Sequence, residues 1–535
     1  MTLDAVAGRS LRTGFLARAA EQPDAPALVV AGSTVTYGTL ERQARVLAAA
    51  ITADGTRGVE RVGVFAYRSV VAYAGTLGAL CAGAAFVPLS PKFPVERTRQ
   101  MLRSAAPEAI VVDKASAPLL AEALAGLELR PRVIAPEPGV AAALVAQGLD
   151  VVGADELAGV APLAELPPAL DDDVAYLLFT SGTTGVPKGV AITHANVLAL
   201  LDVAAQRYAL TPADRCSQTF DQTFDLSVFD LFVAWGAGAC VYVPQPIDLL
   251  APVRFVQKNG LTLWFSVPSV VALAVKKSML HPGAMPTLRY SLFCGEPLPE
   301  ASARAWQTAA PASRVENLYG PTELTIYCFE HVWRDGEATQ ENGIVSIGRP
   351  LPGLGALVVD DDLRPVPDGE PGELLVCGPQ TSPGYWRDAT KTRERFVDVP
   401  LSPTRVKRFY RTGDRVVRGA SGDYTYLGRA DNQIKVLGFR VELGEIEAVL
   451  LRDGNAVQAI AVGWPVEDGR AAGIVAFVTG VTVPGEELVR VVSRTLPTYM
   501  VPSRVIVLDE MPLNANGKID RRALAAQLDD AAPVA

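Results

Sequence analysis

The sequence predicts an α/β protein with a large N-terminal domain of parallel α/β subdomains plus a β-rich subdomain, and a small α+β C-terminal domain. Apolar strand-like runs alternate with amphipathic helical stretches over about the first 400 residues, which is typical of parallel α/β architecture. Short strands and turns dominate from about Gly343. A polar turn that ends at Asp431 then separates two self-contained apolar patterns. We therefore expect domains at 1–430 and 431–535.

The alternation is clearest near the N-terminus, where Val62–Ala66 and Ala109–Val112 are each expected to be a buried strand. The apolar run Gly75–Leu89 is short for a membrane span, and it is expected to be a helix followed by a strand. The Ala- and Pro-rich region Pro131–Pro168 is expected to be a loosely organised connection.

Later elements follow the same reasoning. The β-rich subdomain is expected to hold strands at Ala356–Val359 and Gly372–Val376. In the C-terminal domain we expect strands at about Ala459–Val462 and Gly473–Val478, with a helix near Glu486–Arg494.

Composition excludes several classes of protein. With 535 residues, of which 49% are hydrophobic, the chain can bury a large core. The net charge of −9 argues against a nucleic-acid partner, which would need a basic face. The six cysteines form no Cys-x-x-Cys pair, the three histidines are dispersed, and the N-terminus has no apolar signal region. A protein of the cytoplasm with no membrane contact is expected.

The segment Leu178–Gly189 has the composition of a polyphosphate-binding loop. Its glycines let backbone N–H groups approach an anion, its hydroxyls add donors, and Lys188 adds a positive charge. Apolar runs on both sides indicate a loop between two buried strands. The expected nucleotide contacts here are Thr180, Ser181, Gly182, Thr183, Thr184, Gly185 and Lys188.

The spacing of residues in this loop differs from that of two common nucleotide-binding patterns. The spacing fits neither the Walker A pattern, because no Gly-Lys-Ser/Thr follows at the required interval, nor the Gly-x-Gly-x-x-Gly dinucleotide fingerprint. A solvated turn rich in Gly and Thr is the plain structural alternative.

Further motifs occur in order between about residues 30 and 525. They are Val35-Thr36-Tyr37, Ala82-Gly83-Ala84-Ala85-Phe86-Val87-Pro88, Asn317-Leu318-Tyr319-Gly320-Pro321-Thr322-Glu323, Tyr410-Arg411-Thr412-Gly413-Asp414, Gly428-Arg429-Ala430-Asp431-Asn432-Gln433-Ile434-Lys435 and Pro512-Leu513-Asn514-Ala515-Asn516-Gly517-Lys518. With the loop, this set resembles the freestanding adenylation domains of nonribosomal peptide synthesis, which are adenylate-forming enzymes. One departure is Leu437, where the family usually carries Arg.

The resemblance implies ATP and Mg²⁺ as cofactors. It places Lys518, Thr184, Glu323 and Lys435 among the catalytic groups, with Glu323 as the Mg²⁺ ligand. Asp414 would accept hydrogen bonds from the ribose hydroxyls. The further nucleotide contacts implied are Gly295, Glu296, Asn317, Tyr319, Gly320, Thr322, Tyr426 and Arg429. The alternatives are core aromatics for Tyr319 and Tyr426, and a surface turn for Lys518.

The same resemblance implies two steps. Lys518 would assist formation of an acyl-adenylate, and the small mobile C-terminal domain would then rotate about Asp431. Rotation would withdraw Lys518 and bring the face around Lys435 and Gly438 to the site, where a thiol attacks.

The substrate is expected to be a small neutral apolar amino acid, with L-proline favoured. Asp225 matches the acid that pairs with an α-ammonium group in the family, and its plain alternative is a helix N-cap. Asp230 is expected to be a surface or capping residue. The other expected pocket residues carry no charge: Leu226, Phe229, Phe265, Leu292, Cys294, Leu318, Ile326 and Tyr327.

No condensation motif and no carrier segment are recognisable, so the expected partner is a separate peptidyl carrier protein with a phosphopantetheine arm. Two rival functions remain open. An acyl- or aryl-CoA ligase would share the ATP-binding motifs, and a non-catalytic nucleotide-binding protein could keep the same fold.

Overall fold

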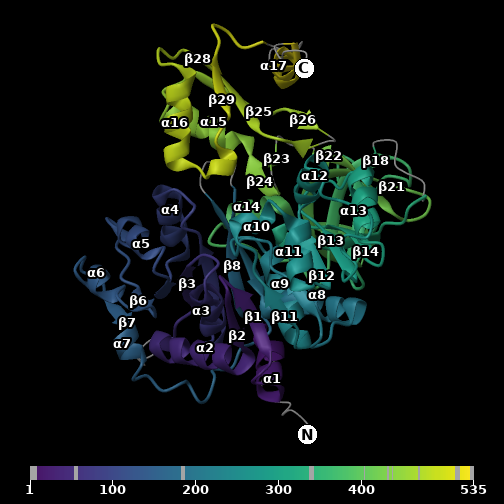
Figure 1. The fold of residues 1–535 in the computed structure, drawn as a ribbon. Coiled ribbons are helices and arrows are strands. Elements are labelled where there is room, and N and C mark those ends of the chain that lie inside the picture. Colours follow the sequence, from purple (N-terminus) through teal and green to yellow (C-terminus); the bar gives the residue numbers. More distant parts are fainter. Residues whose placement is uncertain are drawn as a thin grey trace.

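The computed structural model describes residues 9–52, 58–181, 187–336, 343–402, 404–429, 433–436, 438–467, 470–512 and 519–530. A large N-terminal domain carries a small C-terminal domain on one side, as Figure 1 shows. The large domain contains two mainly parallel sheets and an antiparallel one, so the expected α/β class is confirmed.

The first sheet has eight strands, six of them parallel. In spatial order they are β19 (Gly384–Tyr385), β9 (Lys188–Thr193), β8 (Val174–Thr180), β4 (Ala85–Leu89), β3 (Arg61–Phe65), β5 (Ala109–Val112), β6 (Arg132–Ala135) and β7 (Val151–Gly153). The strands β8 and β9 pair antiparallel up to Thr180 and Lys188, so the glycine-bearing loop joins two buried strands, as predicted.

One expectation for this sheet was wrong. The first half of Pro131–Pro168 is not a loose connection, because β6, α6 (Ala141–Val145), β7 and α7 (Ala154–Leu157) extend the sheet at its edge. These strands are only four and three residues long, and the alanines between them gave no clear periodicity.

The second sheet has nine strands, of which the central six are parallel. In spatial order they are β16 (Arg349–Pro350), β15 (Phe329–Val332), β14 (Arg314–Tyr319), β13 (Tyr290–Phe293), β12 (Leu263–Ser266), β10 (Arg215–Ser217), β11 (Cys240–Tyr242), β1 (Pro26–Val30) and β2 (Ser33–Thr36).

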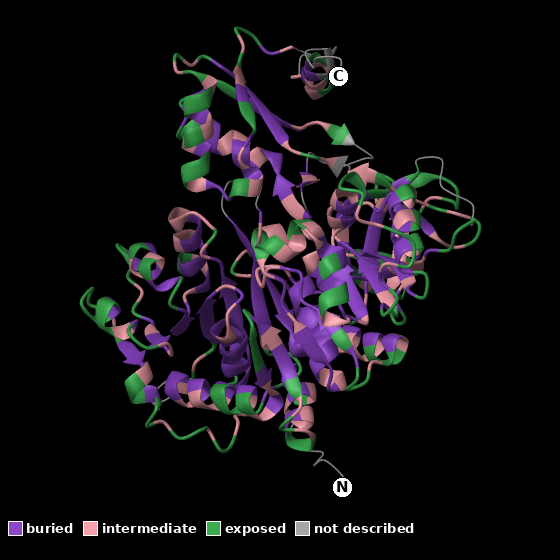
Figure 2. Cartoon of the chain, viewed as in Figure 1, coloured by how far each residue is buried: buried purple, intermediate pink, exposed green. Residues whose placement is uncertain are grey.

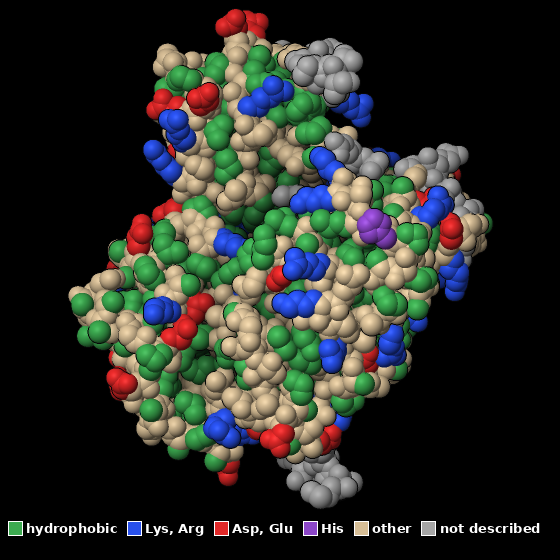
Figure 3. Space-filling model, viewed as in Figure 1, with side chains coloured by type: hydrophobic (Ala, Val, Ile, Leu, Met, Phe, Trp, Pro, Cys, Tyr) green, Lys and Arg blue, Asp and Glu red, His purple; other side chains and the backbone are tan. Residues whose placement is uncertain are grey.

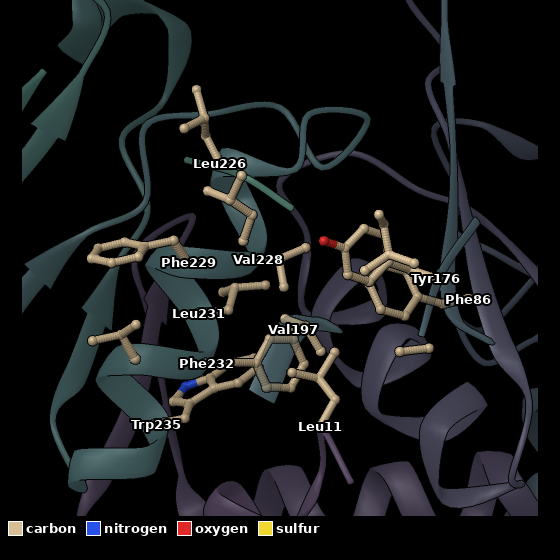
Figure 4. Packing of buried hydrophobic residues seen from close by; sticks show 14 of the residues in the cluster. Leu11, Phe86, Tyr176, Val197, Leu226, Val228, Phe229, Leu231, Phe232 and Trp235 are labelled. Atoms are coloured by element: carbon tan, nitrogen blue, oxygen red, sulfur yellow. The ribbon is translucent and has the colours of Figure 1, made fainter. Parts of the chain in front are cut away.

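Two helices of unusual composition lie between these sheets. Both α3 (Val70–Cys81) and α9 (Leu226–Ala237) are apolar on almost every face, which is typical of helices with protein on all sides. One hydrophobic cluster joins them to strands of both sheets, and Figure 4 shows α9 facing Phe86 and Tyr176 of the first sheet. The N-terminus of α9 is thereby held rigidly next to the ends of β13 and β14.

The outer helices are amphipathic, and buried residues line their inner faces in Figure 2. Packed on the first sheet are α4 (Val95–Ala105) and α5 (Ala117–Leu124), and packed on the second are α11 (Pro252–Asn259), α12 (Pro268–Lys276) and α13 (Glu300–Ala309). The other helices of this domain are α1 (Thr13–Glu21), α2 (Tyr37–Thr52), α8 (His194–Tyr208) and α10 (Pro246–Leu249).

The β-rich subdomain forms an antiparallel sheet of five strands around a small apolar cluster. Its elements are β17 (Gly355–Val359), β18 (Pro371–Cys377), α14 (Ala389–Arg395), β20 (Phe396–Ser402), β21 (Arg405–Arg418) and β22 (Tyr424–Arg429). The strands β21 and β22 pair at Asp414 and Arg429, which brings the motif that ends at Asp414 beside the motif that begins at Gly428.

The small domain has two sheets with their own apolar core. Its elements are β23 (Gln433–Val436), β24 (Phe439–Glu442), α15 (Leu443–Arg452), β25 (Gln458–Gly463), β26 (Val466–Glu467), β27 (Arg470–Ala471), β28 (Ile474–Thr479), α16 (Gly485–Thr495), β29 (Arg504–Val507) and α17 (Arg521–Asp530). It contacts the large domain through the β23–β24 hairpin and through Arg97, whose Nη1 lies 2.9 Å from the Glu445 carboxylate, both side chains being buried. Across the described part of the chain, no helix has the length and apolarity needed to cross a bilayer.

Candidate active site

A cleft opens where the two domains meet, and Figure 3 shows the surface hollowed between them. Its floor is formed by the carboxyl ends of β13 and β14, where Cys294, Gly295 and Gly320 follow the last strand residues. Crevices at this end of parallel strands are where α/β proteins bind ligands. The small domain contributes Lys435 and the residues that follow the hairpin turn.

Three of the residues predicted to hold the nucleoside form a cluster on one wall. Asp414 accepts a hydrogen bond from the Tyr319 hydroxyl, and its other oxygen lies 2.7 Å from Nη1 of Arg429. All three side chains line the cleft. Tyr319 is therefore buried, but it is more than a core aromatic, because its hydroxyl orients an acceptor in the site.

A smaller connected recess is lined by Glu296, Asn317, Leu318, Tyr426 and Lys435. The Asn317 amide donates to the carbonyl oxygens of Val345 and Ser346 at 3.1 and 2.9 Å, so it fixes the wall of the recess. A Glu296 oxygen accepts from the Ser269 N–H at 2.8 Å.

Asp225 immediately precedes α9 and lines the cleft. It occupies the N-cap position, yet its side chain makes no capping hydrogen bond, which disfavours the capping alternative. The Ile326 N–H donates to Oδ2 at 3.3 Å. Burial raises the pKa of Asp225 to about 6, although hydrogen bonds from Thr322 and Ile326 oppose that shift. A cationic partner would stabilise the charged form of this buried carboxylate.

The expected pocket residues divide into two groups. Leu226, Cys294 and Ile326 line the cleft beside Asp225, and burial raises the pKa of the Cys294 thiol to about 12, so it stays protonated. The others are buried behind this lining or in the recess: Phe229, Phe265, Leu292, Leu318 and Tyr327. The Phe229 and Phe265 rings meet edge to face at 5.1 Å, so they limit the depth of any substrate cavity.

The turn behind Asp225 is strained. Thr325 and Ile326 have φ of +58° and +72°, which is rare for β-branched residues and typical of functional sites. The buried Gln380 holds this turn. Its side-chain amide donates to the Tyr327 carbonyl at 2.8 Å, and its backbone carbonyl accepts from the Thr325 hydroxyl at 2.6 Å. Sequence reasoning missed Gln380, which belongs to no motif.

The expectation for Asp230 was wrong. Its side chain is buried rather than at the surface, and one oxygen accepts from the Thr219 N–H at 3.1 Å. Burial raises the pKa of Asp230 well above its ordinary value. The residue therefore packs inside the protein and fastens α9 to the end of β10.

Glu323 is fully buried in the short helix η1 (Thr322–Leu324), whose first residue lines the cleft. The Tyr385 hydroxyl donates to Oε1 at 2.7 Å, and Nη1 of Arg440 lies 2.9 Å from Oε2. Burial alone would raise the pKa of Glu323, but Arg440 and Lys188 outweigh it and lower the pKa to about 2. The described residues include no cluster of three or more metal-ligating side chains. One ionised carboxylate suits Mg²⁺, which takes most of its ligands from water and phosphate.

The phosphate loop contributes its two ends. Thr180 and Ser181 line the cleft, and the Ser181 hydroxyl donates to the Arg440 carbonyl at 2.7 Å. The buried Lys188 has its Nζ 3.4 Å from Oε1 of Glu442. Burial lowers the pKa of Lys188, and the neighbouring Arg440 lowers it further.

The β23–β24 hairpin faces the cleft with Lys435, Gly438, Phe439 and Arg440. Gly438 has φ of +83°, and a Cβ there would lie 2.4 Å from Cγ1 of Val267, so only glycine permits this close approach. Sequence reasoning named Lys435 and Gly438 but missed Arg440 and Glu442, which lie in β24, after the end of the motif.

Several predicted site residues lie outside the described residues, namely Gly182, Thr183, Thr184, Gly185, Asp431 and Lys518, as does the departure at Leu437. Their roles stay predictions from the resemblance.

Comparison with known proteins settles the family. The model of the AMP-binding enzymes matches residues 15–386, and that of the AMP-binding enzyme C-terminal domain matches residues 445–518. The chain belongs to the AMP-binding enzymes. The adenylate-forming fold read from the motifs is thereby confirmed.

The chain matches some relatives over almost their whole length, and others over only a small segment of a much larger protein. An L-proline–[L-prolyl-carrier protein] ligase of Streptomyces coelicolor is 36% identical over 510 residues, with 92% of each chain covered. A probable nonribosomal peptide synthetase of Salinispora arenicola is 37% identical over 95% of this chain, which spans only 6% of that protein. Among solved structures, the Vibrio cholerae adenylation domain AlmE in complex with glycyl-adenosine-5′-phosphate has a TM-score of 0.87 and 30% identity, with 99% of each chain covered.

Proposed function

We propose that this AMP-binding enzyme uses ATP to convert a small neutral amino acid into its aminoacyl-AMP. It then transfers the aminoacyl group to the phosphopantetheine thiol of a separate carrier protein. The relative that is covered almost end to end is a ligase of that kind, which supports the proposal. The six cysteines are all buried and unpaired, in keeping with a cytoplasmic setting.

The first step joins a substrate carboxylate oxygen to the α-phosphorus of ATP and breaks the bond from that phosphorus to the bridging oxygen. Pyrophosphate leaves with both electrons of that bond. Charge accumulates on phosphate oxygens, so positioning and cationic groups dominate catalysis. Asp414 and Arg429, which line the cleft, would hold the ribose. Ser181, which also lines the cleft, and the buried Lys188 at the other end of the phosphate loop would act on the polyphosphate. Glu323 would hold Mg²⁺, which would neutralise charge on the leaving pyrophosphate.

The second step joins the thiol sulfur to the acyl carbon, releases AMP and leaves the thiol proton to solvent. We infer that the small domain adopts the arrangement for this step, because Lys435 and Gly438 face the cleft. Rotation about Asp431 would exchange them for Lys518 in the first step.

The observation that carries the amino-acid assignment is the ionisable Asp225, buried at 6% exposure in the same cleft as the Asp414 cluster. A fatty or aryl acid offers it no cation, whereas the α-ammonium of an amino acid does. The lining beside it is uncharged and the phenylalanines behind it limit depth, which favours a small apolar side chain. We place L-proline first.

Exchange of radiolabelled pyrophosphate into ATP tests this function. With the twenty amino acids offered singly, we expect the strongest exchange with L-proline, and none with fatty or aryl acids. Exchange driven by a fatty or aryl acid would identify a CoA ligase instead. Nucleotide binding with no exchange for any acid would identify a non-catalytic relative.

A pH dependence follows from the pKa of about 6 at Asp225. Its carboxylate is charged above that pH and neutral below it, while the substrate ammonium stays charged throughout. We therefore expect kcat/KM for the amino acid to fall towards tenfold per pH unit below about pH 6. The profile is measured by exchange, with ATP affinity followed in parallel as the control. A flat profile down to pH 5 would remove Asp225 as the ammonium partner.

A further inference from the structure

The β23–β24 hairpin contacts three of the described groups that would act on the polyphosphate end of ATP. The Ser181 hydroxyl donates to the Arg440 carbonyl at 2.7 Å. The Lys188 ammonium lies 3.4 Å from the Glu442 carboxylate. Nη1 of Arg440 lies 2.9 and 3.2 Å from the two oxygens of Glu323. Two of these contacts are ion pairs between the two domains.

The charges involved cannot be left unpaired without cost. Glu323 is fully buried, and the Lys188 side chain is 7% exposed. Removing one partner of a buried ion pair is strongly destabilising, because the remaining charge has lost both water and its counter-ion. When the hairpin withdraws, Glu323 therefore requires another cation, and Lys188 requires another anion.

The hairpin charges are also held in place within the small domain. The Gln433 amide donates to the Glu442 carboxylate at 2.5 Å, so Glu442 reaches Lys188 in a fixed orientation. Two contacts between the domains do not involve the phosphate loop. They are the buried ion pair of Arg97 with Glu445, and the Phe224 and Phe439 rings, whose centroids are 4.6 Å apart. Docking should therefore survive the loss of Arg440, but in weakened form.

We propose that the hairpin is a built-in substitute for magnesium pyrophosphate. Arg440 takes the place of the cation on Glu323, and Glu442 takes the place of a phosphate on Lys188. The docked hairpin and magnesium pyrophosphate then exclude each other, so the transfer arrangement forms only after pyrophosphate has left. With the hairpin docked, or with magnesium pyrophosphate bound, Glu323 and Lys188 each have a partner of opposite charge. Neither arrangement of the domains therefore leaves one of these buried charges unpaired. This inference rests on the proposed function.

Pyrophosphate affinity tests the exclusion directly. The enzyme is loaded with a non-hydrolysable aminoacyl-adenylate analogue and titrated with pyrophosphate at fixed Mg²⁺ in a calorimeter. Competition from the hairpin reduces the apparent association constant for pyrophosphate in proportion to the undocked fraction of the enzyme. Arg440→Gln should therefore bind pyrophosphate about tenfold more tightly than the wild type. The matched control is Arg521→Gln, whose native side chain pairs with Glu447 inside the small domain, and it should bind as the wild type does.

A second readout follows the hairpin itself. Hydrogen exchange of the backbone amides in 433–442 should accelerate in the wild type when Mg²⁺ and pyrophosphate are added together. In Arg440→Gln these amides should exchange faster before any addition. Unchanged or weaker pyrophosphate binding by Arg440→Gln would overturn the inference, as would a hairpin that stays protected at saturating pyrophosphate. Amino-acid-dependent pyrophosphate exchange by the wild type separates failure of the hairpin model from failure of the proposed function. If that activity is absent, the proposed function is wrong. If it is present together with either of these results, only the hairpin's role is refuted.

Discussion

Replacing Asp225 with alanine is expected to abolish amino-acid activation while leaving ATP binding intact. The α-ammonium of the substrate would then enter a buried site without a counter-ion, in a cleft that also holds Lys435. Removing one partner of a buried ion pair costs about 3–5 kcal/mol, which corresponds to roughly 10²–10³ in kcat/KM. Pyrophosphate exchange with the preferred amino acid measures the loss.

Asp225→Asn separates the carboxylate charge from its size. The amide keeps an oxygen for the Ile326 N–H, so the strained turn behind it should keep its geometry. We expect activity nearly as low as that of the alanine variant, with an unchanged ATP dissociation constant by calorimetry. Full exchange activity in either variant would show that the ammonium binds elsewhere.

Lys518→Ala is expected to separate the two chemical steps. The resemblance places this ammonium between the substrate carboxylate and phosphate, where it stabilises charge that develops during adenylation. Loss of one such group costs on the order of 10²–10³ in rate. Adenylate formation should therefore fall by that factor, whereas transfer from supplied aminoacyl-adenylate to the carrier should be nearly unchanged. Single-turnover assays of each step provide the measurement.

Lys435→Ala is the informative counterpart, because Lys435 faces the cleft in the docked arrangement. We expect it to slow transfer more than adenylation, the reverse of Lys518→Ala. If the Lys518 variant lost both steps equally, the lysine would act in binding or folding rather than in one arrangement of the domains.

Sequence patterns predicted those parts of the fold in which local composition is unambiguous. The short runs at β3 and β5 are rich in Val, and the strands on either side of the phosphate loop are mostly apolar. The pattern failed where strands are short and helices rich in alanine, as at β6 and β7. It also misjudged Asp230, because an acidic residue is seldom expected inside an apolar helix.

For the site, motifs supplied residue types but not their partners. The sequence named Glu323 as a metal ligand and Lys188 as a phosphate contact, yet it gave no sign that Arg440 and Glu442 reach them from the other domain. Gln380 and Tyr385 were missed because each acts through contacts with a turn far away in the sequence.

The amino-acid sequence by itself determined the chemistry available to this protein: a glycine-bearing anion loop, a buried acid for an amine, and ordered motifs for a nucleotide. Such signals are local, since each depends on neighbours along the chain. Only the tertiary structure decided which charges meet, because Glu323 and Arg440 are 117 positions apart and lie in different domains. Because Glu323 is fully buried, separating the two charges is strongly destabilising unless each gains another partner of opposite charge.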